Sequence, residues 1–275
     1  MPEENIIVSV GGSVERAVKG EYSIDVKAIL TEAWQKTLQS RMSINIALLL
    51  VSVFGMIVSF VSSSFFGGIE QVIDDPELLQ LINVIVTIAV WPFMAGIEMM
   101  GVYHAVNKPT QSKMVFSFLH RGSWVALCAL LTSLLIGIGF QLFLIPGVLL
   151  AVLLSLTIPL VVEKKLTPVQ AIILSVKALR FKILPLLAIF LILFLALIAL
   201  TFPIALLIES SFAPLAIMVF LFGLSYLAPW YYNIKGVLYR EIFGVFTEQK
   251  NVENGVNHSA NNDSDQSGSD DTFSA

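Results

Sequence analysis

The sequence has few charged residues, one cysteine and three histidines. Asp, Glu, Lys and Arg make up 13% of its 275 residues, against roughly a quarter in an ordinary soluble domain. The lone cysteine, Cys128, excludes an internal disulfide framework. The sequence has no His-Glu-x-x-His pattern and no Ser/His/Asp grouping, so it offers no basis for a metal or catalytic site. We therefore expect no enzyme, no metal, no cofactor and no nucleic-acid partner.

The hydrophobic residues, 56% of the chain, lie in long blocks. A helix crosses the hydrocarbon core of a bilayer with about 20 apolar residues. Six blocks have about that length, at about 44–65, 79–104, 122–145, 147–163, 183–208 and 212–236. The sequence therefore predicts an all-α, polytopic membrane protein with six transmembrane helices.

The two ends of the chain differ from this membrane domain, which we place over residues 23–246. Residues 1–22 are mixed polar and charged, and we predict a flexible segment there. Residues 247–275 are rich in Asn, Ser, Asp and Gly and have almost no apolar content. Such a composition cannot bury enough surface to fold, so we predict a disordered acidic tail.

The third and fourth blocks are separated only by Pro146-Gly147, a turn dipeptide. Two interpretations compete, a tight hairpin on the outer face or one kinked helix of about 40 residues. We favour the hairpin because a helix of about 40 residues is about twice as long as the bilayer is thick.

The placement of Lys and Arg tests this number of spans independently. The loop from Gly67 to Leu78 and the loop near Glu209 have no Lys or Arg. All basic residues fall in the other segments, at Arg16, Lys19, Lys27, Lys36, Arg41, Lys108, Lys113, Arg121, Lys164, Lys165, Lys177, Arg180, Lys182, Lys235, Arg240 and Lys250. Because cytoplasmic loops carry the excess of Lys and Arg, the alternation predicts six spans with both termini in the cytoplasm.

The chain also contains an internal repeat. Pro109-Thr110-Gln111 matches Pro168-Val169-Gln170 at an offset of 59 residues, and Arg121 matches Arg180 at the same offset. A membrane span follows each Arg. In the second copy Thr167 is a candidate N-cap, with Gln170 placed to close a capping box.

The repeated segments have the periodicity of amphipathic helices. The apolar stripe of the second copy is Val169, Ile172, Ile173, Val176 and Leu179. A possible third copy precedes the first span and has the stripe Val26, Ile29, Leu30, Ala33, Trp34 and Leu38, followed by Arg41. The pattern predicts three hairpins, each introduced by a helix. These helices either lie in the cytoplasmic membrane interface or act as connectors packed on the bundle.

The chain resembles the membrane domain attached to some bacterial glycerophosphodiester phosphodiesterases, and free-standing multi-pass relatives of that domain. Three motifs carry the resemblance: Ile145-Pro146-Gly147, Thr167-Pro168-Val169-Gln170-Ala171 running on to Ser175 and Arg180, and Leu238-Tyr239-Arg240. It covers roughly residues 24–245, and nothing in the chain corresponds to the soluble phosphodiesterase domain. The resemblance implies a bacterial inner membrane and supplies no catalytic residue.

Glu98 and His104 are ionisable residues within the second predicted span, and such residues are functional candidates by default. Glu98 is expected either to pair with Arg121 or Arg180 or to bind a proton or cation. His104 is expected at the surface. The candidate contacts to lipid headgroups are Lys113, Arg121, Lys177, Arg180 and Lys182.

Three functions are compatible with these features. The first is a non-enzymatic protein that organises the bilayer, interacts with lipids or maintains the envelope, with anionic lipids as the partner. The second is a small solute or ion transporter or channel, suggested by the repeat and by prolines in the spans. The third is an accessory subunit of another membrane protein, suggested by the acidic tail.

Overall fold

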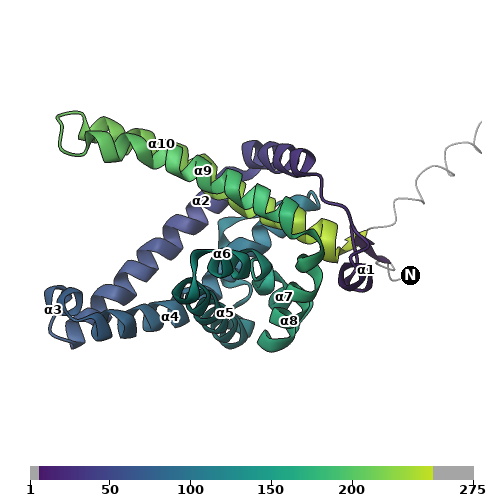
Figure 1. The fold of residues 1–275 in the computed structure, drawn as a ribbon, viewed down its shortest axis with the longest axis horizontal. Helices are drawn as coiled ribbons and strands as arrows, with labels where there is room; N and C mark the ends of the chain where they lie inside the picture. Colours follow the sequence, from purple (N-terminus) through teal and green to yellow (C-terminus); the bar gives the residue numbers. More distant parts are fainter. Residues whose placement is uncertain (1–5, 250–275) are drawn as a thin grey trace, which may run out of the picture. The chain divides into compact units, whose positions relative to one another are not determined.

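A computed structural model describes residues 6–249, which are mostly helical (Figure 1). The chain forms two compact units, the larger being Val10–Val245; the described part of the smaller comprises residues 6–9 and 246–249. Strands β1 and β2 pair in a two-stranded sheet. The elements are β1 (Ile6–Val10), α1 (Val14–Lys19), α2 (Val26–Phe65), α3 (Ile69–Asp74), α4 (Pro76–Ala105), η1 (Ser112–Phe116), η2 (Leu119–Arg121), α5 (Gly122–Leu142), α6 (Leu144–Leu153), α7 (Thr157–Glu163), α8 (Pro168–Leu179), η3 (Arg180–Lys182), α9 (Ile183–Leu207), α10 (Ala213–Phe243) and β2 (Val245–Gln249).

Six helical segments are long and apolar enough to cross a membrane. They lie in α2, in α4, in η1–α5, in α6–α7, in α8–α9 and in α10, and each covers all but at most three residues of one predicted span. The prediction of an all-α polytopic membrane protein is confirmed.

Buried residues concentrate at one end of these helices. In α4 every residue from Ala95 to Ala105 except Tyr103 is buried, whereas Ile82 is the only buried residue before them. In α10 burial is nearly continuous from Tyr232 to Phe243, and all of Thr157 to Val162 in α7 is buried. This is the end that carries the basic residues. The opposite halves of these helices expose Leu, Ile and Phe side chains. This exposure has no free-energy cost where lipid tails surround the side chains.

We call the buried end the base. It comprises α1, residues 26–43 of α2, residues 95–105 of α4, η1, η2, α7, α8 and residues 229–243 of α10. The outer parts of the spans form three helical hairpins, α2 with α4, α5 with α6, and α9 with α10. Figure 1 shows α9 beside α10 and α5 beside α6.

In each hairpin a glycine lies where the two helices come close together. A Cβ on Gly55 of α2 would lie 3.3 Å from the side chain of Val90, and one on Gly223 of α10 would lie 2.2 Å from the side chain of Leu200. In the middle hairpin a Cβ on Gly139 would lie 2.9 Å from the Cα of Gly147. These contacts fit the close helix approach that small residues permit in membranes.

The structure confirms a hairpin between the third and fourth spans but moves its turn. The chain reverses at Phe143, which has an extended backbone (φ −164°, ψ 162°). Pro146 and Gly147 lie inside the first turns of α6. Proline is tolerated there because the first helical N–H groups have no partner in the helix. The turn predicted at Pro146-Gly147 is therefore misplaced by a few residues.

The repeat is only partly visible in the structure. The capping box of Thr167 and Gln170 is present at the start of α8. The first copy instead forms the short helices η1 and η2, because the backbone of η1 packs against α4 where Gly96 leaves room: a Cβ there would lie 2.6 Å from the Cα of Val115. The third candidate copy is the continuous N-terminal part of α2. Three separate interfacial helices are thus not found.

The predicted flexible segment is folded over its described residues. Ser13 accepts a hydrogen bond from the Arg16 N–H and caps α1, and Ala17 is buried. Tyr22 Oη donates to the Ala178 carbonyl at 2.8 Å, and burial raises the pKa of Tyr22 to about 12. Residues 14–22 thus form a helix and a contact with α8, and the flexibility of residues 1–22 stays a prediction. Of the predicted acidic tail, residues 250–275 lie outside the described residues, and residues 247–249 belong to β2.

Candidate functional site

The centre of the base is a close crossing of α4 and α10. A Cβ on Gly101 would lie 2.2 Å from the Tyr232 carbonyl oxygen, and one on Gly236 would lie 2.0 Å from the Gly101 carbonyl oxygen. The two backbones are therefore in direct contact, and polar side chains on either side of the glycines are brought together.

One such pair is Glu98 of α4 and Lys235 of α10. Lys235 Nζ lies 2.5 Å from Glu98 Oε1, and the two side chains are 6% and 4% exposed. The Lys235 ammonium also lies 5.5 Å from the centre of the Tyr231 ring. Glu98 Oε2 accepts no hydrogen bond from any residue that the structure describes. Glu98 thus makes its only charged contact through the oxygen that faces Lys235.

A second set of polar contacts surrounds His104. Its Nδ1 lies 2.8 Å from Asn233 Oδ1, and its Nε2 lies 2.6 Å from Thr110 Oγ1. Asn233 Nδ2 donates in turn to Thr37 Oγ1 at 2.9 Å. Since Asn233 Oδ1 can only accept, Nδ1 of His104 carries the proton. These contacts link α2, α4, α10 and the loop before η1, and they occupy both imidazole nitrogens.

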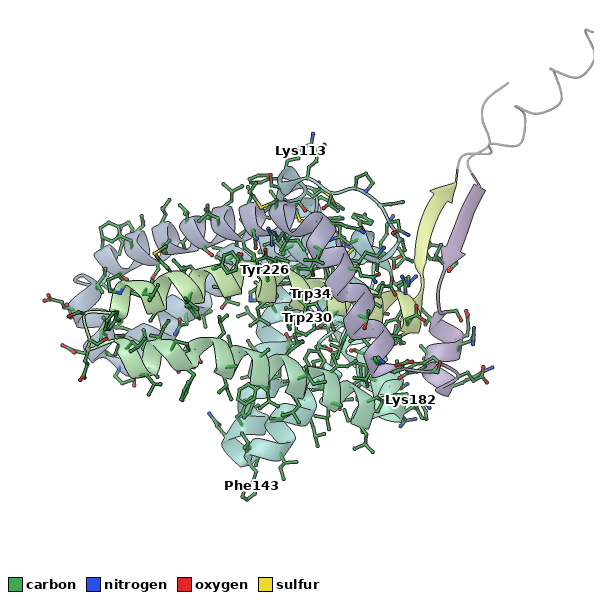
Figure 2. The ribbon with its side chains drawn as sticks, turned by 90° about the horizontal axis from the view of Figure 1, so that it is seen from above. Trp34, Lys113, Phe143, Lys182, Tyr226 and Trp230 are labelled. Atoms are coloured by element: carbon green, nitrogen blue, oxygen red, sulfur yellow. The ribbon has the colours of Figure 1, made fainter. Side chains whose placement is uncertain are left out.

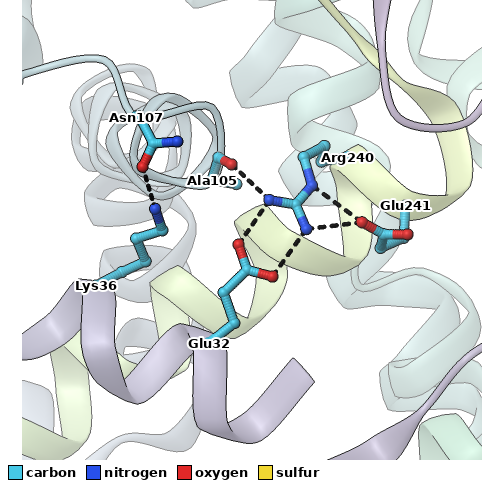
Figure 3. A network of polar contacts seen from close by, with 6 residues as sticks. All are labelled: Glu32, Lys36, Ala105, Asn107, Arg240 and Glu241. Carbon is cyan, nitrogen blue, oxygen red and sulfur yellow. Dashed lines mark hydrogen bonds and ion pairs between the residues drawn. The ribbon is translucent and has the colours of Figure 1, made fainter. Parts of the chain in front are cut away.

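Arg240 joins the ends of the same three helices (Figure 3). Its guanidinium donates to both carboxylate oxygens of Glu32 in α2, at 2.6 and 2.8 Å. It also donates to the Ala105 carbonyl at the end of α4, at 2.6 Å, and to Glu241. Bidentate pairs of this kind are the stronger and more directional ion pairs. Lys36, also on α2, bonds Asn107 just beyond α4.

A third ion pair lies beside α7. Lys164 Nζ is 3.2 Å from Glu163 Oε2, and Tyr239 Oη of α10 donates to the same carboxylate oxygen at 2.8 Å. Lys164 also donates to the Gly244 carbonyl. The base is therefore held by ion pairs that join α2 and α4 to α10, and by the hydrogen bond from Tyr239 to Glu163, which joins α10 to α7.

The predicted headgroup contacts lie on the outside of the base. Lys113, Lys177 and Arg180 are exposed, and Arg121 and Lys182 are partly exposed. Figure 2 shows Lys113 and Lys182 well away from Phe143, the turn of the α5–α6 hairpin. These residues lie close to the points where α5 and α9 begin.

Helix α8 presents two different apolar faces. Its small residues Ala171, Ser175 and Ala178 are buried against the base, together with Leu179. The larger residues Val169 and Ile173 point outward and are 58% and 47% exposed. Lys177 is exposed next to them on the helix surface. The predicted stripe is therefore divided between the two faces: Leu179 is buried, whereas Val169 and Ile173 lie on the exposed face.

The predicted partners of Glu98 are wrong. Glu98 pairs with Lys235, while Arg121 donates to the Lys165 carbonyl and Arg180 lies over the ring of Phe181. Lys235 stands at the end of the sixth predicted span and counts there as a cytoplasmic basic residue, although the apolar residues Val237, Leu238, Ile242 and Phe243 after it signal a helix that stays buried. His104, expected at the surface, is buried because Asn233 and Thr110 satisfy its ring.

Among residues 6–249, no group of three or more His, Cys, Asp or Glu side chains is arranged to hold a metal ion. Comparisons with models of known protein families, with curated proteins and with solved structures find no match for the chain. The chemistry of the candidate sites therefore rests on their own geometry: a paired, buried polar centre and an exposed basic and apolar rim.

Proposed function

We propose that this protein is a non-enzymatic membrane protein whose base binds anionic lipid headgroups and thereby organises the surrounding bilayer. The proposal rests on the outward face of α8, the helix that precedes the span of α9. On this face Val169 and Ile173 are exposed beside Lys177. Exposed apolar side chains next to basic ones are the pattern of a helix lying in a membrane interface.

The distribution of charge supports the same function. The α2–α4 and α9–α10 loops have acidic but no basic residues, and the α5–α6 turn has neither, whereas the base carries Lys and Arg around its rim. By the preference of cytoplasmic loops for basic residues, we propose that the base and both termini lie in the cytoplasm. The resemblance described above supports a bacterial inner membrane as the location that we propose.

The paired groups of the buried centre also favour this function over transport. Glu98, His104 and Arg240 each bond to a residue of a neighbouring helix, which holds the helices of the base together. A rigid base with exposed cations suits a protein that holds lipids at its surface.

Neutralising the rim should weaken lipid binding. Each Lys or Arg near an anionic surface contributes about 1 kcal/mol, so the variant Lys177→Gln/Arg180→Gln/Lys182→Gln should bind phosphatidylglycerol roughly 100-fold more weakly than the wild type. The measurement is titration of purified protein in neutral detergent with phosphatidylglycerol and with phosphatidylcholine, followed by native mass spectrometry.

The matched control is Arg16→Gln/Lys19→Gln/Lys27→Gln, which removes the same charge from exposed positions in α1 and at the start of α2, outside the segments that directly precede α5 and α9. It should bind like the wild type. Equal loss in both variants would mean that net charge alone attracts the lipid, and wild-type protein with no preference for phosphatidylglycerol would refute the proposed function.

A further inference from the structure

Two basic residues from different loops meet at the rim of the base. Arg121 ends η2 just before α5, and Lys165 follows α7. Arg121 Nη2 donates to the Lys165 carbonyl oxygen at 3.2 Å. The contact connects the loop between the second and third spans to the loop between the fourth and fifth.

The backbone of Lys165 is in the left-handed region, with φ at +55°. Side chains with a Cβ are strained there, and the residue after a helix that adopts this conformation is usually glycine or asparagine. Asn107 has the corresponding conformation (φ +58°) after α4, which fits that preference. A lysine at such a position makes the local backbone less stable than a glycine would. Backbone strain of this kind suggests a functional reason for the side chain.

Neither cation is neutralised by protein. Within the described part of the chain, no acidic side chain forms an ion pair with Arg121 or Lys165, whereas the neighbouring Lys164 is paired with Glu163. The Arg121 guanidinium lies against the backbone of Lys165, and the exposed Lys165 side chain carries its ammonium on a flexible stem, so that one anion can contact both cations. Guanidinium and ammonium groups together suit the oxygens of a phosphate.

The surroundings identify the source of the phosphate. Trp124 lies three residues after Arg121, one turn further into α5 and on the same side of the helix, and is 43% exposed. Phe116 and Leu119, just before Arg121, are exposed as well. A tryptophan at the start of a span belongs to the membrane interface. Arg121 therefore has exposed apolar side chains close to it in the sequence, and these suit the glycerol and upper acyl region of a lipid.

We propose that Arg121 and Lys165 bind the phosphate of one anionic phospholipid, with Trp124 contacting its acyl region. The site deepens the proposed function and rests on it, because it assigns one particular lipid position within the rim. By bridging two loops, the lipid also joins the second hairpin to the first and third.

Lys165→Gly separates the role of the charge from the stability of the fold. The substitution removes the ammonium and the backbone strain but keeps the carbonyl that Arg121 contacts. We expect the melting temperature without lipid to rise by about 2–4 °C, and the affinity for dihexanoyl phosphatidylglycerol to fall roughly five- to tenfold. Arg121→Gln should lower the affinity similarly, and Lys27→Gln should leave it unchanged.

Parallel titrations with inorganic phosphate and with dihexanoyl phosphatidylcholine identify the ligand. Weak binding of both supports an anionic phospholipid, whereas phosphate binding as tight as that of the lipid would overturn the lipid assignment. If the wild type prefers the anionic lipid but Lys165→Gly and Arg121→Gln bind it as Lys27→Gln does, the site is refuted while the proposed function stands. If the wild type shows no preference, the proposed function itself fails.

Discussion

Replacing Lys235 by methionine should destabilise the protein by about 3–5 kcal/mol, because it leaves the carboxylate of Glu98 buried without a countercharge. The side chain of Glu98 is 4% exposed, so water cannot replace the ammonium without opening the crossing of α4 and α10. The effect should appear as a large fall in the apparent melting temperature of the detergent-purified protein.

The double variant Glu98→Met/Lys235→Met tests the cause of that loss. Replacing both members of a buried ion pair by apolar residues of similar size is often neutral or stabilising, so the double variant should be more stable than Lys235→Met alone. The control Lys177→Met changes an exposed lysine and should alter stability by less than about 0.5 kcal/mol. A double variant as unstable as the single one would show that Lys235 stabilises the base by packing, independently of its charge.

The second large effect is expected at the glycine crossing. An added methyl group in Gly236→Ala would lie 2.0 Å from the Gly101 carbonyl oxygen, so α4 and α10 must separate. Inserting a methyl group into close-packed structure usually costs about 1–3 kcal/mol, and a clash with the backbone of α4, which cannot rotate away as a side chain can, places this variant at about 3 kcal/mol or more. We expect poor accumulation in the membrane and a lowered melting temperature.

Gly137→Ala is the matched control, because a Cβ on Gly137 meets nothing within 4 Å. It lies within a helix and should be neutral or slightly stabilising. Separation of the helices also breaks the contact of Glu98 with Lys235, so the two predicted losses should be less than additive when combined. A Gly236→Ala protein as stable as Gly137→Ala would mean that the two backbones are not in contact.

The spans could be predicted from sequence because lipid imposes one simple requirement. Leu, Ile, Val and Phe in blocks of about 20 residues satisfy it wherever the helices pack, and each of the six segments covers all but at most three residues of one predicted block. The cap of α8 could be predicted as well, because the hydrogen bonds between Thr167 and Gln170 lie within the first turn of that helix.

The base could not be predicted in the same way, because its contacts join residues far apart in the chain. Lys235 belongs to the buried centre only because Gly101 and Gly236 let α10 approach α4. The same dependence on tertiary contacts explains the first copy of the repeat, where packing against Gly96 prevails over helical periodicity. The turn lies at Phe143 and not at the predicted Pro146-Gly147 for a local reason, because proline is well placed in the first turn of a helix.

The proposed function requires that the base faces the cytoplasm and that the turn at Phe143 faces the opposite side. Single cysteines introduced into a Cys128→Ala background at Gln71, Phe143, Ser23 and Ser117 test this directly, because all four positions are exposed. In intact spheroplasts treated with a membrane-impermeant maleimide, the cysteines at Gln71 and Phe143 should react, and those at Ser23 and Ser117 should react only after permeabilisation. Labelling at Ser117 in intact spheroplasts, or protection at Phe143, would contradict the topology and the lipid-binding role built on it.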